Sequence, residues 1–256
     1  MAVSRFLQFA TVSFLAPLLL ASSARAGQIT GTATLNGKAP EMQPIDMSSK
    51  PECANQHADP VLEETVVVND QNMLKNVVVY LKAADGSDLP GDVPKPAAIL
   101  DQKGCVYVPH VVAMMAGQTL VVKNDDNCAH NIHSMAENNE VFNFIEPTKG
   151  NQKAAPPQKT PEFYQVKCDI HPWMSAWVAV LDNPYYAVTD DDGRFKIDTG
   201  KLPDGTYTLV AWQEKYKTIE QKVTLKNGSA GDVRIVYAAE TNKAEAPTPT
   251  KSPKKG

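Results

Sequence analysis

The chain lacks several features that mark large classes of proteins. It has no dense cluster of basic residues: 25 Lys and Arg stand against 29 Asp and Glu, and the formal net charge is −4. Since nucleic-acid binding needs a basic surface, we expect no nucleic-acid partner. Long apolar runs are missing after residue 26, so we expect no stable membrane insertion of the remaining chain. Four cysteines are too few for a disulfide scaffold.

Sustained helical periodicity is also missing, and strand-like segments take its place. Apolar and polar residues alternate, or β-branched residues follow one another, with Asn-Gly and Asp-Gly turns between the segments. This spacing predicts an all-β chain of antiparallel sandwiches. The expected strands are QITGTATLNG (28–37), ETVVVND (64–70), KNVVVYLK (75–82), GCVYVPHVV (104–112), AGQTLVVKN (116–124), EFYQVKC (162–168), SAWVAVL (175–181), GRFKI (193–197), GTYTLVAW (205–212) and QKVTLKN (221–227).

The first 26 residues have the pattern of a secretory signal peptide. Arg5 precedes an apolar stretch, and the small-x-small motif at residues 24–26 predicts cleavage before Gly27. Polar residues and Pro17 interrupt the apolar stretch, which disfavours a permanent anchor. We therefore expect a periplasmic or secreted protein.

Changes in composition divide the rest of the chain. Residues 88–97 and 146–162 are Pro-rich and predict long loops, and a boundary falls near residues 182–188. The expected divisions are a signal peptide (1–26), N-terminal strands (27–94), a first sandwich (95–182), a second small sandwich (185–240) and a disordered tail (241–256).

Three soft metal ligands share one turn between two predicted strands. Cys168, His171 and Met174 offer a thiolate, an imidazole and a thioether at three-residue spacing. This set suits copper, because a blue-copper site needs two histidines, one cysteine and a weak axial methionine. Zinc is disfavoured, because a thioether is a poor zinc ligand. His130 and His133, on the expected loop after the strand ending near residue 124, are candidates for the second histidine.

These motifs resemble a known family. CDIHPWM (168–174) resembles the ligand loop of cupredoxins, amicyanin in particular, and AHNIH (129–133) resembles the segment that carries the first histidine. The resemblance implies a Greek-key cupredoxin sandwich over residues 95–182. It also implies one mononuclear type 1 copper site, with Asn131 tying the two ligand loops together. The implied ligands are His130, Cys168, His171 and Met174.

The same resemblance implies a route for electrons and a kind of partner. His171, beside Pro172 and Trp173, would be an exposed edge where a redox protein docks. A cytochrome or a dehydrogenase is the implied partner. Amicyanin accepts electrons from an amine dehydrogenase, so methylamine oxidation is one pathway that the resemblance suggests.

The C-terminal segment carries a second resemblance. TDDDGRFKI (189–197), followed by LPDGTYTLVAW (202–212), resembles the transthyretin-like, carboxypeptidase regulatory-like domain, a small β-sandwich. GQITGTATLNGKAP (27–40) resembles the first strand of the same domain type. One option is therefore that the first sandwich is inserted, with residues 27–40 completing the second.

Two interpretations of the other cysteines stay open, a disulfide and a second metal site. Cys53 and Cys105 form the natural disulfide pair in an exported protein once the cysteine of the turn serves the metal. Alternatively, the same two residues with His57 and His110 form a Cys2His2 set for a second metal. Cys128 is then unpaired, and its role stays open.

Several functions compete on this reading. The first is an exported one-electron carrier and not an enzyme, since a copper enzyme needs more histidines than the leftover His57, His110 and His133 supply. The alternatives are copper storage or delivery, and a cell-surface structural β-protein with a non-redox cupredoxin domain.

Overall fold

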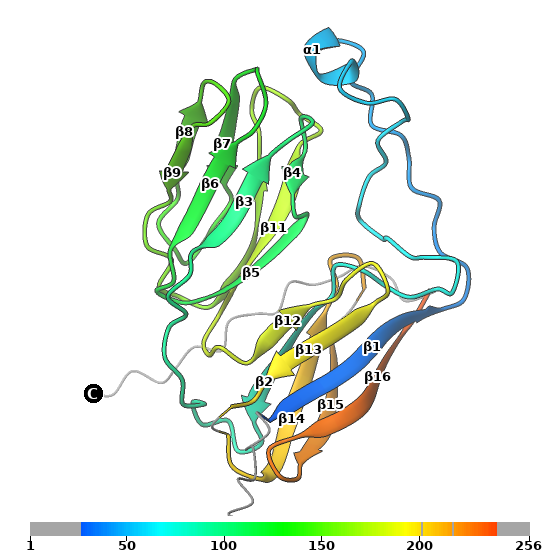
Figure 1. Cartoon of the computed structure of the whole chain (residues 1–256), viewed down its shortest axis with the longest axis vertical. Helices are drawn as coiled ribbons and strands as arrows, with labels where there is room; N and C mark the ends of the chain where they lie inside the picture. Colours follow the sequence, from blue (N-terminus) through cyan, green and yellow to red (C-terminus); the bar gives the residue numbers. More distant parts are fainter. Residues whose placement is uncertain (1–26, 201, 217, 240–256) are drawn as a thin grey trace, which may run out of the picture.

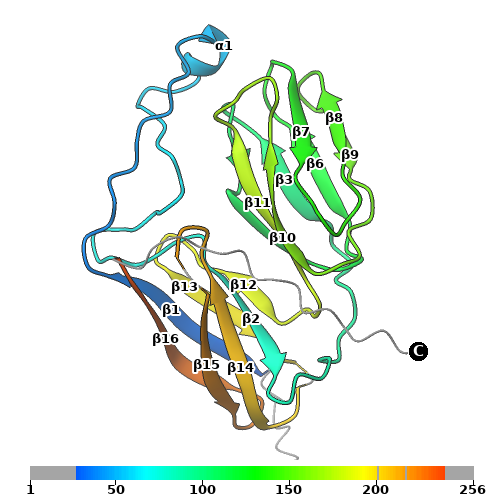
Figure 2. The ribbon, with the colours of Figure 1, turned by 180° about the vertical axis from the view of Figure 1, so that it is seen from behind.

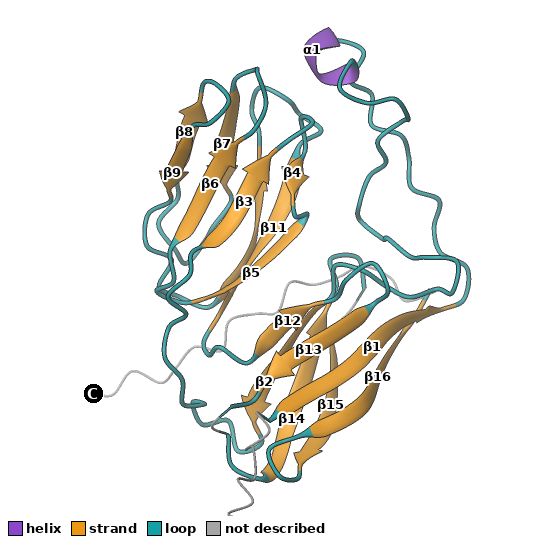
Figure 3. Ribbon diagram, in the orientation of Figure 1, coloured by secondary structure: helices purple, strands orange, loops and turns teal. Residues whose placement is uncertain are grey.

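We describe a computed structural model of the chain over residues 27–200, 202–216 and 218–239. The predicted signal peptide and disordered tail lie outside these residues. Almost all regular structure is β, which confirms the all-β prediction, and the single short helix of the described residues is purple in Figure 3. The elements are β1 Gln28–Asn36, α1 Pro51–Ala54, β2 Val78–Ala83, β3 Ala98–Gln102, β4 Tyr107–Val108, β5 Val111–Met115, β6 Leu120–Asn124, β7 His130–Ser134, β8 Asn143–Glu146, β9 Gln152–Ala154, β10 Glu162–Lys167, β11 Ser175–Leu181, β12 Tyr186–Val188, β13 Arg194–Asp198, β14 Gly205–Trp212, β15 Ile219–Leu225 and β16 Ala230–Ala238.

One sandwich, here called the split sandwich, takes its strands from both ends of the described chain. Its sheets have the orders β13-β1-β16 and β12-β2-β14-β15 (Figure 1). β1 pairs antiparallel with β13 and parallel with β16, so the N-terminal strand completes this sandwich. β2, which precedes the first predicted sandwich in sequence, belongs here too, because it pairs with β12 and β14.

The other sandwich, here called the inserted sandwich, is a continuous stretch between β2 and β12. Its sheets have the orders β5-β11-β10-β7-β8 and β4-β3-β6-β9. Figure 2 shows β10 and β11 on the side turned away in Figure 1. Apolar side chains from both sheets fill its core, among them Leu100, Met114, Val122, Ile132 and Val178.

Most strand pairs are antiparallel, as predicted, but both sandwiches also contain parallel pairs that the prediction did not include. β1 pairs parallel with β16, β3 with β6, and β5 with β11. The partners in each pair are separated by other strands, and the chain crosses between the two sheets before it returns. Turn residues report only pairings between consecutive strands, so these distant partners left no local signal.

An apolar interface joins the two sandwiches. Val77, Val79 and Leu81 point into the core of the split sandwich. Val78 and Tyr80, on the opposite face of β2, pack against the inserted sandwich. Because both faces of the strand are buried, its sequence is a continuous apolar run without alternation.

Residues 37–76, here called the arm, leave the split sandwich after β1 and return to it before β2. The arm carries α1 toward one pole of the inserted sandwich (Figure 1). The strand expected at residues 64–70 does not form, and only an isolated bridge between Val68 and Leu74 is present there. Among the described residues there is no helix with the length and apolarity to cross a membrane.

Candidate metal centre

The turn between β10 and β11 holds three predicted ligands at one pole of the inserted sandwich. The two strands pair antiparallel up to Lys167 and Ser175, so the turn starts at Cys168. The Cys168 N–H donates to the Met174 carbonyl at 3.1 Å, and the Met174 N–H donates to the His171 carbonyl at 2.9 Å. These bonds fold the turn back on itself. All three predicted ligand side chains are buried, with at most 2% exposure.

His130 comes from β7, the strand that neighbours β10. We expected His130 and His133 on a loop, but both lie in this strand, and the loop prediction is wrong. Side chains of a strand alternate between its two faces, and residues three apart point in opposite directions. His130 is therefore fully buried, whereas His133 is partly exposed and its Nδ1 lies 3.1 Å from Asp169. Of the two histidines, only His130 lies among the predicted ligands of the turn.

The two buried imidazoles face each other, each with its Nδ1 atom. His130 Nδ1 and His171 Nδ1 are 2.9 Å apart, and Cys168 Sγ lies 3.8 Å from His171 Nδ1. One ligand atom from each of these residues lies within 4.8 Å of the others. The structure thus brings three of the four predicted ligand residues into one cluster of possible metal ligands. Met174 is buried in the same turn.

Asp126 contacts Nε2 of His130, here called the outer nitrogen. Its Oδ2 lies 2.9 Å from His130 Nε2, and both side chains are buried. The carboxylate also accepts the N–H groups of Gly104 and Cys105, each at 2.7 Å, which fixes its orientation. A carboxylate on the outer nitrogen holds the proton there and leaves the Nδ1 lone pair free for a metal ion.

Burial and neighbouring charges set the protonation of these groups. Burial lowers the pKa of His130, but its hydrogen bonds with Asp126 and Cys168 outweigh this effect, so the pKa lies above its ordinary value. Burial and the charge of His130 lower the pKa of His171 to about 4. Burial raises the pKa of the Cys168 thiol, but the hydrogen bonds from His130 and from backbone N–H groups, Asn131 among them, together outweigh it and the pKa is lowered. A thiolate and a neutral His171 are forms that metal ligands need.

Asn131 ties the two ligand-bearing segments together. Its Oδ1 accepts the Asp169 N–H at 2.5 Å, and its own N–H donates to Cys168 Sγ at 3.5 Å. Its carbonyl accepts the Tyr107 hydroxyl at 2.7 Å. The position of His130 relative to the turn is therefore fixed by hydrogen bonds on both sides of β7.

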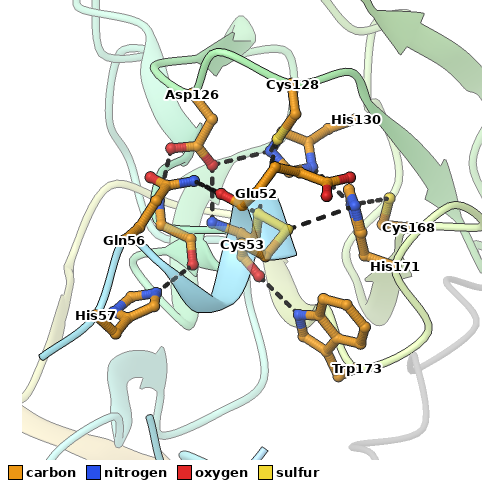
Figure 4. The surroundings of a disulfide bond; sticks show 12 residues. Glu52, Cys53, Gln56, His57, Asp126, Cys128, His130, Cys168, His171 and Trp173 are labelled. Atoms are coloured by element: carbon orange, nitrogen blue, oxygen red, sulfur yellow. Dashed lines mark hydrogen bonds and ion pairs between the residues drawn. A yellow bond between two sulfur atoms is a disulfide. The ribbon is translucent and has the colours of Figure 1, made fainter. Parts of the chain in front are cut away.

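α1 covers the site, and this corrects the expectation of an exposed His171 edge. Cys53 and Cys105 form a disulfide, as predicted, which ties α1 to the loop between β3 and β4. Cys53 Sγ lies 3.6 Å from His171 Nε2, and His171 is only 1% exposed (Figure 4). Trp173 is partly exposed, and its ring centroid is 5.2 Å from that of His171.

The alternative Cys2His2 site does not form. Its two cysteines are joined in the disulfide, His57 Nε2 lies 2.7 Å from the Gly104 carbonyl, and His110 Nε2 lies 2.5 Å from Glu214 Oε2. Cys128, whose place was open, lies beside the outer nitrogen of His130, with its Sγ 3.5 Å from Nε2.

Two parts of the site were missed by the sequence analysis. Asp126 precedes His130 by four residues, and an acid so close to a predicted ligand histidine was a usable signal for a hydrogen-bonded partner. The cover formed by α1 had no such signal. The disulfide prediction brought Cys53 to Cys105, but nothing in the sequence placed Cys105 beside His171.

Comparisons with solved structures match part of the chain. A novel purple cupredoxin from Nitrosopumilus maritimus is 25% identical over 33% of this chain and 99% of its own, with a TM-score of 0.29. Amicyanin from Paracoccus versutus is 23% identical over 42% of this chain and 99% of its own, with a TM-score of 0.30. A copper-containing nitrite reductase from Thermus scotoductus is 18% identical over 40% of this chain and 27% of its own, with a TM-score of 0.33. No protein-family model and no curated protein matches the chain.

Proposed function

We propose that the inserted sandwich binds one copper ion in a mononuclear site and carries single electrons. His130, Cys168 and His171 would hold the metal, with Met174 as the fourth ligand. The observation that carries this proposal is the buried cluster of one thiol and two imidazoles whose Nδ1 atoms face each other. A soft set of two histidines, one cysteine and one methionine is the ligand type of blue-copper sites.

The residues around this cluster fit a copper ion. Asp126 occupies the outer nitrogen of His130, so Nδ1 is the nitrogen left to coordinate. The Asn131 N–H points at the Cys168 sulfur, where a hydrogen bond tunes the potential of a thiolate-bound metal. When bound, copper supplies a one-electron couple between Cu(II) and Cu(I). The chain's own part is to hold the ligands rigid, so that little moves when an electron arrives.

Burial favours electron transfer over copper delivery. A delivery site passes its ion to the ligands of a partner, which must reach the metal. Here the predicted ligands have at most 2% exposure, and α1 lies over His171. An electron needs no such direct access.

Export and a redox partner are part of the same proposal. The N-terminal pattern of a signal peptide supports a periplasmic or secreted protein, and disulfides persist in such oxidising compartments. We place the docking surface of a cytochrome or a dehydrogenase around Trp173 and α1, because His171 itself is covered. An amine dehydrogenase is one candidate, suggested by the resemblance of the turn to that of amicyanin. The transthyretin-like resemblance gives the split sandwich a supporting role, as the base from which the arm extends.

The test is a visible absorption and EPR spectrum of residues 27–256 with one equivalent of Cu(II). We expect an intense thiolate-to-copper band, narrow hyperfine splitting and reversible bleaching by ascorbate. Cys168→Ala should abolish the band, whereas Cys128→Ala should keep it. A pale spectrum, or a band that survives in Cys168→Ala, would overturn the proposal.

The axial ligand has a separate test. Met174→Gln should keep the copper and lower its reduction potential, because a stronger axial ligand stabilises Cu(II). Protein-film voltammetry measures this shift. An unchanged potential would remove Met174 from the ligand set.

A further inference from the structure

Three sulfur atoms from three separate segments meet beside the candidate metal centre. Cys105 comes from the loop between β3 and β4. Cys53 of α1 and Cys128 of the loop between β6 and β7 are labelled in Figure 4. The first two form the disulfide. The sulfur of Cys128, a free thiol, lies 3.7 Å from Cys105 Sγ. A thiol in contact with one sulfur of a disulfide is the arrangement from which exchange starts.

We propose that Cys128 exchanges with this disulfide and thereby unlatches α1 from the metal centre. The Cys128 thiolate attacks Cys105 Sγ, the Cys105–Cys128 bond forms, and the Cys53–Cys105 bond breaks. Cys53 leaves as a thiolate and takes up the proton that Cys128 lost. One disulfide is present before and after, so the step consumes no oxidant and no reductant.

The contact decides which cysteine is released. Cys128 meets the sulfur of Cys105, so attack there frees Cys53 and keeps Cys105 bonded. The loops that carry Cys105 and Cys128 are already held together by Asp126, which accepts the Cys105 N–H and contacts His130. Cys105 has a left-handed backbone with φ of 54°, and this hydrogen bond holds it there. The new disulfide would therefore join two loops that are in place.

Release of Cys53 acts on the cover over His171. In the latched form, Cys53 Sγ lies 3.6 Å from His171 Nε2. The remaining ties of the arm near this pole are non-covalent. Ala54 packs against the core, Gln56 Nε2 donates to Cys105 Sγ at 3.7 Å, and His57 Nε2 lies 2.7 Å from the Gly104 carbonyl. Without its covalent tie, α1 is free to lift and expose His171. That lifting α1 changes the docking surface of an electron partner rests on the proposed function; the exchange itself does not.

The exchange is tested on the metal-free chain of residues 27–256 by disulfide mapping. The protein is incubated near neutral pH, quenched in acid to stop exchange, digested with pepsin without reductant, and analysed by mass spectrometry. We expect two linked peptide pairs in the wild type, Cys53–Cys105 and Cys105–Cys128, and only the first in Cys128→Ser. A linkage through Cys168 in place of Cys105–Cys128 would overturn the proposal.

A second variant keeps the test decisive when the latched form dominates. Ala54 packs against the core of the inserted sandwich, so Ala54→Asp should weaken the docking of α1. The share of the Cys105–Cys128 pair should then rise about tenfold, the change that a typical destabilising substitution of this size gives. If the pair is absent from both the wild type and this variant, no exchange occurs and the proposal fails.

The effect on the cover has its own readout. Cys53→Ser mimics the released form, and Cys128→Ser keeps the latched form. Diethyl pyrocarbonate should modify His171 at least about tenfold faster in Cys53→Ser than in Cys128→Ser, because the cover opens locally. Equal rates would show that the disulfide does not latch the cover. None of these measurements needs copper. A protein that exchanges its disulfide but shows no blue colour would contradict only the proposed function, and a blue protein that does not exchange would contradict only the present proposal.

Discussion

The two sandwiches of this chain share an architecture and differ in what they bury. Each has two sheets packed around an apolar core. Among the described residues of the split sandwich, the buried polar side chains carry no charge, as Thr189, Thr199 and Gln213 show. The inserted sandwich buries carboxylates and imidazoles as well, among them Asp126, Glu146, Glu162, His130 and His171.

This difference shows the condition under which a sandwich can bury charged side chains. Buried charge is costly unless hydrogen bonds replace the lost water. Glu162 accepts the N–H of Asn138 at 3.1 Å and the side-chain amide of Asn139 at 2.9 Å. Asp126 has equivalent partners near the metal centre. The fold supplies a rigid frame in both sandwiches, and the loops of one supply the partners that make a site possible.

The largest expected effect comes from removing a ligand at the polar pole. His130→Ala should weaken copper binding at least about 100-fold, because a ligand matters at least as much as the partners that support it. His133→Ala, on the same strand but the opposite face, should change it by less than about threefold. Competition titration against a copper chelator measures both. If His133→Ala has the larger effect, the assignment from strand alternation is wrong.

The interface between the sandwiches gives the next largest effect. Trp212 is fully buried there, with its ring 5.1 Å from that of Trp177. Trp212→Ala should cost about 3–5 kcal/mol and separate the unfolding of the two sandwiches. Chemical denaturation followed by circular dichroism would then show two transitions. Val236→Ala, at an exposed strand position, should leave the midpoint nearly unchanged. An unaltered single transition in Trp212→Ala would contradict the coupling.

Glu146 tests the cost of buried charge within the inserted sandwich. Burial raises its pKa to about 7, with Asp101 adding to the effect and Lys153 opposing it. The folded state therefore favours the protonated form. The contribution of protonated Glu146 to the stability of the fold is complete below the ordinary carboxyl pKa, and it is lost as pH rises through about 7.

Glu146→Gln should remove this pH dependence. We expect the metal-free variant to be more stable than the wild type at pH 8, by about 3 kcal/mol, and equal to it at pH 4. Thermal unfolding at both pH values measures the difference. Glu140→Gln, at an exposed position, serves as the control. A wild type whose stability rises between pH 5 and 8 relative to the variant would refute the raised pKa.

The smallest expected effect concerns the partner of His130. Asp126→Asn should weaken copper binding about 10–100-fold, because the ligand loses the carboxylate that orients it. Asp125→Asn changes the neighbouring carboxylate, which lies 3.6 Å from the Lys123 ammonium group, and should have little effect. Equal affinities in the two variants would mean that Asp126 serves only the loop that contains Cys105.

The sequence by itself determined hairpin strands with clear alternation, such as β10 with β11 and β14 with β15, and the turn with three soft ligands. β10 and β11 follow the predicted segments closely, because alternation and a short connection are local properties. The disulfide could also be anticipated, since Cys53 and Cys105 remained once one cysteine was assigned to the metal. Short strands such as β8 and β9 gave too few residues for a pattern and were missed, and β16 was missed although it is nine residues long.

Only the tertiary structure decided the parallel pairings, the choice between His130 and His133, and the cover over His171. Each depends on segments far apart in the chain, which meet through pairing, strand faces or packing. The arm shows the reason most clearly. Its path from β1 to the pole of the inserted sandwich is set by a disulfide spanning 52 residues and by contacts with a different sandwich. Local patterns record which face of a segment is apolar, but they do not record what that face will meet.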